Sequence, residues 1–576
     1  MGRPAGPLAR AFALVAAMMM FGGCASMGGK TAEAPRSNIL LILADDLGYS
    51  DIGPFGSEIR TPNIDALARE GRLLTSFYAT SMPSSRAEVM TGSDHHLAGM
   101  GSMYTGWGAQ ARTPYYLKEL NPTTVTAAEL LRDAGYHTYM IGTWHLGETE
   151  AQNPHARGFE YSHALLPAAG TYWAPPAVLP EGAHQAPIYS ENGQRIPAPE
   201  EYITDFWTDW LISNITQRAS DGRPFFAYAA YTSPHFPLQV TDAFIDRYRG
   251  VYDGGFDALR QRRIARQREL GIIPQDMTPA IPAPVSTRLP LWSQLTPAQR
   301  ARESRRAEIY AAMIENFDWN IGRLIAALKA SGQYDNTLIV FTSGNGAAQG
   351  YPEREVEDNR FENMGRKGSW IYYTERWAEA SNAPFASWKA KPMEGGISVP
   401  TIVRLPGQTT AAPTSDAIST LRDLLPTFAE IAGAELPNGT YKGRAVQPIT
   451  GRSMLPFLRG QASSIHPADA VFADENSGEA YVRQGEWKAV LMSDSHTNPF
   501  ERGEPDNLEH LTALRAGDFA RAAQIRERQF PARWRLYNMR TDRGETRDVA
   551  AEHPDVLARL RTLYEEYRNT HGVVDP

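Results

Sequence analysis

Five polar side chains that could take part in binding or proton transfer each follow a short apolar run. Asp45 and Asp46 come directly after the first run, His145 after the second, His235 after the third and Asn345 after the fourth. Adjacent buried carboxylates repel each other, and a hard cation with oxygen ligands relieves that repulsion. Histidine is the side chain that titrates nearest to neutral pH. If these residues meet, their types predict a cation site flanked by titratable groups.

The four apolar runs have the character of strands buried on both faces of a parallel sheet. They are short, β-branched or aromatic and nearly continuous: residues 38–44, 137–142, 225–231 and 337–343. Helix-like stretches lie between them, at residues 61–71, 124–135 and 305–332. The sequence therefore predicts an α/β fold, with a mostly parallel sheet and helices on both faces. Ligands bind at the carboxyl ends of strands in such sheets, so the five residues should converge.

Each of these polar groups also has a plainer explanation. The pair Asp45 and Asp46 could cap the next helix, because aspartate is favoured at helix starts. A single histidine after a strand, such as His145 or His235, is often structural. Their common position after four strands favours a functional site over these alternatives.

Length and composition set outer limits. The chain has 576 residues, which predicts one large domain and a smaller one. Hydrophobic residues make up 42% and charged residues 21%, and the formal net charge is -8. This balance gives no reason to expect nucleic acid as a partner.

The first 36 residues differ from the rest. Arg3 and Arg10 precede an apolar run that is too short to span a bilayer, so the segment predicts an export signal. Cys24 is the only cysteine, which excludes a disulfide within the chain. The preceding residues resemble the lipobox of bacterial lipoproteins, which implies a lipid anchor on Cys24 and a periplasmic, outer-membrane lipoprotein. Ordinary cleavage that discards Cys24 is the alternative.

Seven collinear segments resemble sulfatases, particularly bacterial arylsulfatases of the alkaline-phosphatase-like superfamily. They are residues 38–71, 85–103, 134–147, 231–239, 310–325, 395–407 and 533–555. The resemblance implies that fold, hydrolysis of sulfate esters, a calcium ion and an anionic small-molecule or glycan substrate. In this family a Cys or Ser of a C/S-x-P-S/T-R signature becomes formylglycine, which attacks sulfur.

The nucleophile position of that signature is degenerate here. Arg86 fits its last residue, and counting back four residues from it reaches Met82. A thioether cannot become formylglycine and has no proton to lose. In a second register Ser81 is the nucleophile, and one extra residue turns Arg86 by about 100° if the segment is helical. We favour the Met82 register.

Two neighbouring serines could each have one of two roles. Ser84 and Ser85 could cap the following helix, which is their more common role at such a position, or act as hydroxyl nucleophiles.

Two further positions depart from the family pattern. The family's lysine in G-K-W-H-L-G is Thr143 here, which removes a positive charge. Its Asp-Asn metal pair reads Gly344 and Asn345, so one negatively charged calcium ligand is missing. Calcium affinity depends on the number and charge of the oxygen ligands, so binding should be weakened.

The other family positions are matched. The resemblance implies these roles: Asp45, Asp46 and Asn345 as metal ligands, Arg86 beside the nucleophile, His145 and His235 as sulfate-contacting or acid–base groups, and Lys389 as the sulfate-binding lysine. Lys391 is an alternative to Lys389, and a solvated lysine pair is the plainer explanation of both.

The C-terminal part predicts a smaller subdomain. Short strand-like runs near residues 468–491 and 533–539 precede a helical pattern at residues 555–569. They resemble the small antiparallel sheet and closing helix of sulfatases. We therefore predict a tether over 1–36, a sulfatase-type α/β domain over 37–435 and a C-terminal α+β subdomain over 436–576.

Two functions follow. The first is an arylsulfatase-like hydrolase of sulfate esters, or a phosphoester hydrolase, that uses a serine or a metal-bound water instead of formylglycine. The second is a catalytically inactive sulfatase-fold protein that binds a sulfated or other anionic ligand. The retained charged residues favour the first, and Met82, Thr143 and Gly344 favour the second.

Overall fold

A nine-stranded sheet forms the centre of the fold. The computed structural model describes residues 1–2, 36–80, 84–102, 106, 108–175, 187–283, 290–350, 357–493, 508–529 and 531–575. The strand order is β2-β10-β9-β1-β8-β4-β5-β6-β7. The strands are β2 (Arg72–Leu74), β10 (Thr401–Arg404), β9 (Thr337–Ser343), β1 (Asn38–Asp45), β8 (Phe225–Pro234), β4 (His137–Thr143), β5 (Tyr161–Leu165), β6 (Tyr189–Glu191) and β7 (Gln194–Ile196).

The four predicted strands are confirmed and lie side by side. β9, β1, β8 and β4 are neighbours in the sheet, and each adjacent pair is parallel. Their carboxyl ends therefore share one edge. The sheet is mixed at its margins, because β10, β2, β6 and β7 pair antiparallel.

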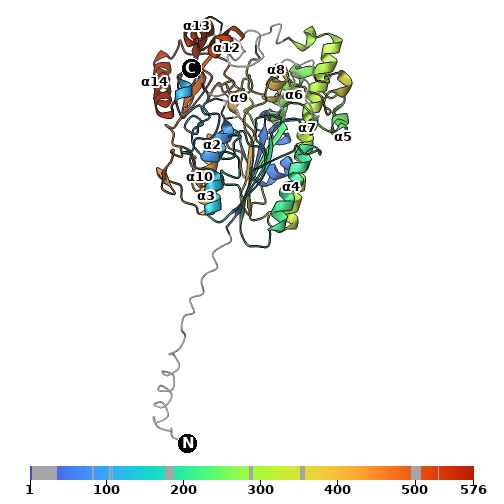
Figure 1. Cartoon of the computed structure of the whole chain (residues 1–576), viewed down its shortest axis with the longest axis vertical. Coiled ribbons are helices and arrows are strands. Elements are labelled where there is room, and N and C mark those ends of the chain that lie inside the picture. Colours follow the sequence, from blue (N-terminus) through green and yellow to red (C-terminus); the bar gives the residue numbers. More distant parts are fainter. Residues whose placement is uncertain are drawn as a thin grey trace. The chain divides into compact units, whose positions relative to one another are not determined.

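The continuous apolar runs are explained by two cores, one on each face of the sheet. Along β1, Leu40 and Ile42 face one core, whereas Ile39 and Leu41 face the other. α4 (Ile203–Gln217) and α7 (Pro297–Ala330) cover the first face, and α6 (Gly255–Glu269) packs against α7. α2 (Ser85–Thr91), α3 (Ala127–Asp133) and α10 (Leu424–Ala432) cover the second face (Figure 1). A strand buried on both faces cannot alternate between apolar and polar residues.

The predicted helices are present, with ends set by local capping. α3 begins after Thr126, whose hydroxyl accepts the Glu129 N–H in a capping box. α7 begins at Pro297 rather than at residue 305, because Thr296 and Gln299 form a second capping box. Further helices are α1 (Pro62–Glu70), α5 (Asp242–Ile245), α8 (Glu375–Ser381), α9 (Glu394–Ile397) and α11 (Leu455–Leu458).

A separate four-stranded antiparallel sheet follows near the C-terminus. Its order is β14 (Val471–Asn476), β15 (Glu479–Gln484), β16 (Trp487–Ser493) and β17 (Ala532–Asn538). The closing helix α14 (Pro554–His571) packs on one face through Leu560 and Tyr564. The opposite face packs on Tyr78 and Ile397 of the larger part. The sequence did not predict α12 (Leu508–Arg515) and α13 (Phe519–Gln529), which lie between β16 and β17.

Short strand pairs complete the described elements. β3 (Phe77–Tyr78) pairs with β11 (Ser419–Thr420), and β12 (Thr440–Tyr441) pairs with β13 (Arg444–Ala445). No helix in the described ranges is both long and apolar enough for a membrane span. The predicted export signal and the lipidation at Cys24 lie outside the described residues. The domain boundary near residue 435 stays a prediction.

Candidate functional site

The sheet edge brings the predicted residues together. Asp45 is the last residue of β1, and Asn345 follows β9 by two residues. His235 directly follows β8. Asp46 Oδ1 accepts a hydrogen bond of 2.8 Å from Asn345 Nδ2, and Asp46 Oδ2 lies 3.5 Å from His235 Nε2. Residues from three different strands therefore meet around Asp46.

The backbone conformation at two of these residues directs their side chains. Asp46 and His145 have positive φ values of 67° and 53°. Residues other than glycine seldom adopt this conformation, and it is concentrated at functional sites. The chain therefore turns away from the direction of β1 at Asp46 and from the direction of β4 at His145.

Each aspartate has a buried cationic partner. Arg86 Nη2 donates to Asp45 Oδ2 at 3.1 Å, and Lys389 Nζ donates to Asp46 Oδ1 at 2.6 Å. Burial alone would raise the pKa of Asp45, but the charges of Arg86, His235 and Lys389 lower it to about 2. Asp45 is therefore ionised at neutral pH, as a metal ligand must be.

Three oxygen atoms of the site fit a hard cation. Asp45 Oδ1, Asp46 Oδ2 and Asn345 Oδ1 are buried and have no hydrogen-bond partner among the described residues. Buried polar atoms nearly always have a hydrogen-bond partner, so these oxygens indicate a place for a further ligand, although Asp46 Oδ2 also lies 3.5 Å from His235 Nε2. Carboxylate and amide oxygens are the ligands that calcium prefers. The residues present therefore fit the cation that the family resemblance implies.

The two histidines differ in their surroundings. His235 Nδ1 donates to the Phe236 carbonyl oxygen at 2.7 Å, which fixes the orientation of its ring. His145 is buried, and its Nδ1 has no partner in the described part of the chain. Burial lowers the pKa of His145 to about 3, and the charge of Arg86 acts in the same direction. The imidazole of His145 is thus neutral at neutral pH.

The signature segment is described only in part. Ser81 and Met82 lie outside the described residues, so their expected roles stay predictions. α2 begins at Ser85, and Ser84 occupies the N-cap position. The expected capping by the Ser84 side chain is wrong within the described residues. Its hydroxyl lies 3.4 Å from the Thr80 hydroxyl instead of accepting a helix N–H.

Thr143 and Arg86 are linked through the backbone. Arg86 Nε donates to the Thr143 carbonyl oxygen at 3.2 Å, so the end of β4 helps to hold the guanidinium. The Thr143 hydroxyl lies 2.7 Å from the Thr232 hydroxyl on β8. A neutral pair of hydroxyls therefore stands where the resemblance expects a lysine.

The structure separates the two candidate lysines. Lys389 contacts Asp46, whereas Lys391 Nζ lies 3.0 Å from Glu479 Oε2 on β15. Both side chains are buried, so the explanation as a solvated pair is wrong. Lys391 joins the larger part to the C-terminal sheet and does not contact the aspartates.

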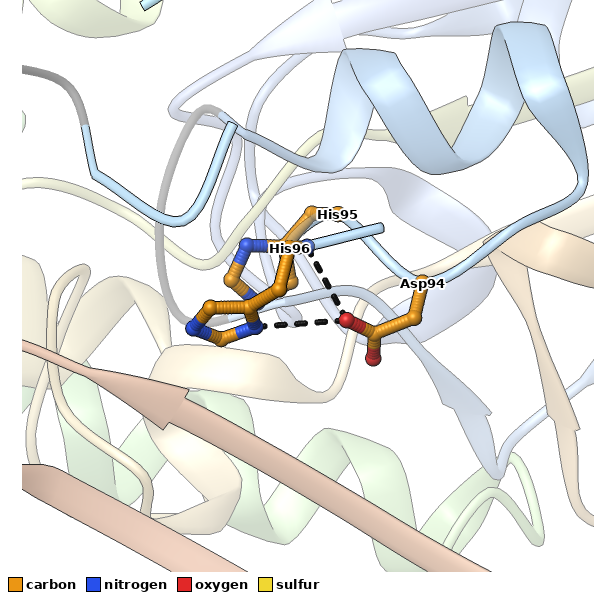
Figure 2. Close-up of side chains that lie close together, drawn as sticks. All are labelled: Asp94, His95 and His96. Carbon is orange, nitrogen blue, oxygen red and sulfur yellow. Dashed lines mark hydrogen bonds and ion pairs between the residues drawn. The ribbon is translucent and has the colours of Figure 1, made fainter. Parts of the chain in front are cut away.

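Sequence reasoning missed a second polar cluster, formed by Asp94, His95 and His96 after α2. Their ligand-type atoms lie within 4.8 Å of one another, and His96 contacts Asp94 Oδ1 through both its backbone N–H and its ring (Figure 2). His95 Nε2 lies 2.8 Å from Asp474 Oδ1, and His96 Nε2 lies 3.1 Å from Glu475 Oε2, both on β14. The cluster therefore bridges the large part and the small sheet.

This cluster has the character of an ion-pair network rather than a metal centre. Every ring nitrogen of His95 and His96 already has a hydrogen-bond partner. Burial would lower the pKa of His95, but the Asp474 hydrogen bond and the charge of Asp94 raise it to about 10. A metal needs a neutral imidazole, so a histidine that holds its proton this firmly is a poor ligand.

Comparisons with known proteins find relatives that match most of the chain. The sequence model of the sulfatase family matches residues 37–434. An uncharacterized sulfatase of Schizosaccharomyces pombe is 35% identical over 570 residues, which cover 95% of this chain and 96% of that protein. The arylsulfatase of Klebsiella aerogenes is 35% identical over 457 residues, which cover 77% and 96%. The crystal structure of Ps i-CgsB is similar with a TM-score of 0.62, at 25% identity and 92% coverage of both chains.

Proposed function

Because the chain belongs to the sulfatase family, we propose that it hydrolyses sulfate esters of the aryl sulfate type without formylglycine. The observation that carries this proposal is the set of buried oxygens of Asp45, Asp46 and Asn345 that make no hydrogen bond within the described residues and lie beside Arg86 and Lys389. Such a set can bind a cation and a sulfate group together. The family and the fold support a sulfuric-ester-hydrolase-like function.

The cationic side chains bind the sulfate group in this proposal. Arg86 presents a planar fork of donors and Lys389 a compact positive charge, which suit oxyanions. A calcium ion held by Asp45, Asp46 and Asn345 would supply further positive charge to the sulfate oxygens. Donors fixed in a buried site stabilise developing negative charge more strongly than water does.

In this proposal His145 transfers a proton and His235 contacts the sulfate group. His145 is neutral at neutral pH because its pKa is lowered to about 3, so its ring can offer one N–H and one lone pair. We assign it to the leaving oxygen or to the attacking hydroxyl. His235 is held by the Phe236 carbonyl and faces Asp46, so we assign it to contact with the sulfate group.

The nucleophile is a hydroxyl or a water molecule in this proposal. Met82 cannot attack sulfur, because a thioether has no proton to lose. Ser81, Ser84 and Ser85 are the hydroxyl candidates nearest in sequence. The Ser84 hydroxyl faces Thr80, whereas the Ser85 hydroxyl is buried with no partner among the described residues.

One observation favours a second function, in which the protein binds an anionic ligand without turnover. The pairs Arg86–Asp45 and Lys389–Asp46 balance the two carboxylates without a cation. The departures at Thr143 and Gly344 favour the same binding function, because they remove one positive and one negative charge of the family pattern.

Location and substrate complete the proposal. The N-terminal segment supports export, and we propose a lipid anchor on Cys24 at the periplasmic face of the outer membrane. The substrate class is an anionic small molecule or glycan that carries a sulfate ester.

The test is turnover of a chromogenic aryl sulfate, with the matching phosphate mono- and diesters as competitors. The protein without residues 1–30 is assayed with calcium present, and His145→Ala is the control. We expect the sulfate ester to turn over and the control to lose at least about 100-fold in rate. Binding of inorganic sulfate without turnover of any ester would support the binding function instead.

A further inference from the structure

The absence of a side chain at Gly344 leaves a narrow space beside the guanidinium of Arg86, in which a Cβ would already be in tight contact with Ser85. A Cβ built on Gly344 would lie 3.2 Å from Ser85 Oγ, 3.8 Å from the Ala44 carbonyl oxygen and 3.9 Å from Arg86 Nη1. The Ala44 oxygen already accepts the Gly344 N–H at 3.0 Å. The other two atoms therefore define the polar wall of this space.

Both of those wall atoms need a partner. Ser85 Oγ and Arg86 Nη1 are completely buried and make no hydrogen bond with any residue that the structure describes. The other two nitrogens of Arg86 are engaged, Nη2 with Asp45 and Nε with the Thr143 carbonyl. Arg86 Nη1 is therefore available to donate a hydrogen bond to a ligand.

We propose that the space beside Gly344 is a subsite for one oxygen atom of the substrate's oxyanion, bound by Ser85 Oγ and Arg86 Nη1. This inference rests on the proposed function, because it specifies how the sulfate group is held. A substrate oxygen takes the place of the carboxylate that the family resemblance expects at residue 344. Ser85 is then a binding residue for the reacting group.

Charge favours an anion at this place over a cation. Among the three atoms nearest to a Cβ at residue 344, the charged one belongs to the guanidinium of Arg86, which attracts an oxyanion. A hydroxyl such as Ser85 Oγ can donate to an oxygen that Arg86 also contacts. A tetrahedral sulfate has other oxygens left for Lys389 and for the cation ligands Asp45, Asp46 and Asn345.

The test is calorimetric binding of inorganic sulfate and, separately, of calcium to the folded protein. Ser85→Ala removes one donor, and Gly344→Ala fills the space with a methyl group. The matched control is Ser162→Ala on β5, because the Ser162 hydroxyl is also buried and without a partner in the described ranges. Thermal unfolding checks that each variant is folded.

We expect Ser85→Ala to weaken sulfate binding by about tenfold, because it removes one hydrogen bond to a charged ligand. Gly344→Ala should weaken sulfate binding by at least about the same factor, because its methyl group occupies the place of the sulfate oxygen. Calcium binding and the Ser162→Ala control should stay within about twofold of the parent. Unchanged sulfate affinity in Ser85→Ala would overturn the proposal. Loss of calcium rather than sulfate affinity would also overturn it, because the hydroxyl would then be a cation ligand.

The outcomes separate this inference from the proposed function. If sulfate binding depends on Ser85 but no ester is turned over, the proposed subsite is supported and the proposed hydrolysis is refuted. If esters are turned over while Ser85→Ala and Gly344→Ala bind sulfate normally, hydrolysis stands and the subsite fails. A parent protein that binds no sulfate would overturn the subsite outright.

Discussion

Lys389 Nζ lies 2.6 Å from Asp46 Oδ1, so a cation of the chain itself stands beside a carboxylate suited to a metal ion. Arg86 stands in the same relation to Asp45 at 3.1 Å. The negative charges of the two carboxylates are therefore compensated by Arg86 and Lys389 before any ligand binds. A divalent cation would add two positive charges, which an anionic ligand can offset.

This balance predicts that calcium and sulfate strengthen each other's binding. We expect saturating sulfate to tighten calcium binding by roughly fivefold or more, and calcium to tighten sulfate binding by the same factor. Asn345→Ala should weaken calcium binding because it removes a partnerless ligand oxygen. Calorimetry with each ligand in the presence of the other measures the coupling. Asn214→Ala on α4 is the control, and independent binding of the two ligands would refute the charge argument.

The Arg86–Asp45 pair predicts a large stability effect. Arg86→Met leaves the Asp45 carboxylate buried without its partner, which should lower the free energy of unfolding by about 3–5 kcal/mol. Arg366→Met breaks an exposed pair with Asp242 and should cost less than about 1 kcal/mol. Urea unfolding followed by tryptophan fluorescence gives both values. Equal effects of the two substitutions would show that burial does not decide the contribution of the pair.

The contact of His95 with Asp474 on the small sheet predicts that the free energy of unfolding depends on pH. The pKa of His95 is raised from 6.5 to about 10 in the folded protein. Its protonated form therefore stabilises the fold fully below pH 6.5, and this contribution is lost as the pH rises towards 10. Urea unfolding at several pH values should show this decline in the parent and a weaker one in His95→Gln.

The exposed His155 supplies the control for that experiment, and His155→Gln should keep the parent's pH dependence. Added zinc should leave the unfolding midpoint unchanged, because the ring nitrogens of His95 and His96 are already occupied. A zinc-dependent rise that disappears in His95→Gln would identify a metal centre and contradict the ion-pair interpretation.

Restoring the missing carboxylate should strengthen the cation site. Gly344→Asp adds a charged oxygen ligand next to Asn345, and we expect calcium affinity to rise by about tenfold or more. Its Cβ would stand 3.2 Å from Ser85 Oγ, so the hydroxyl must shift slightly. Calcium titration of Gly344→Asp and Gly344→Ala separates the carboxylate from the extra carbon. An unchanged affinity in Gly344→Asp would place residue 344 outside the cation site.

The sequence predicted the fold well where burial controls residue choice. β1, β4, β8 and β9 are recognisable because strands covered by two cores must be apolar almost throughout. α12 and α13 were missed. Helix boundaries also shifted, because the capping of α7 at Thr296 lies outside its apolar pattern.

The site could be predicted as a set of residues but not as a set of contacts. Adjacent strand ends imply that Asp46, His235 and Asn345 converge. Local sequence cannot distinguish Lys389 from Lys391, because their partners Asp46 and Glu479 are distant in the chain. The network of His95 with Asp474 is equally long-range, spanning 379 positions.

The most direct test of the account is the rate of aryl sulfate hydrolysis by Met82→Leu beside the parent protein. If Met82 occupies the nucleophile position without taking part in the reaction, the two rates should agree within about twofold, because neither a thioether nor leucine can attack sulfur. A parent without turnover, or a Met82→Leu variant as inactive as His145→Ala, would contradict the account.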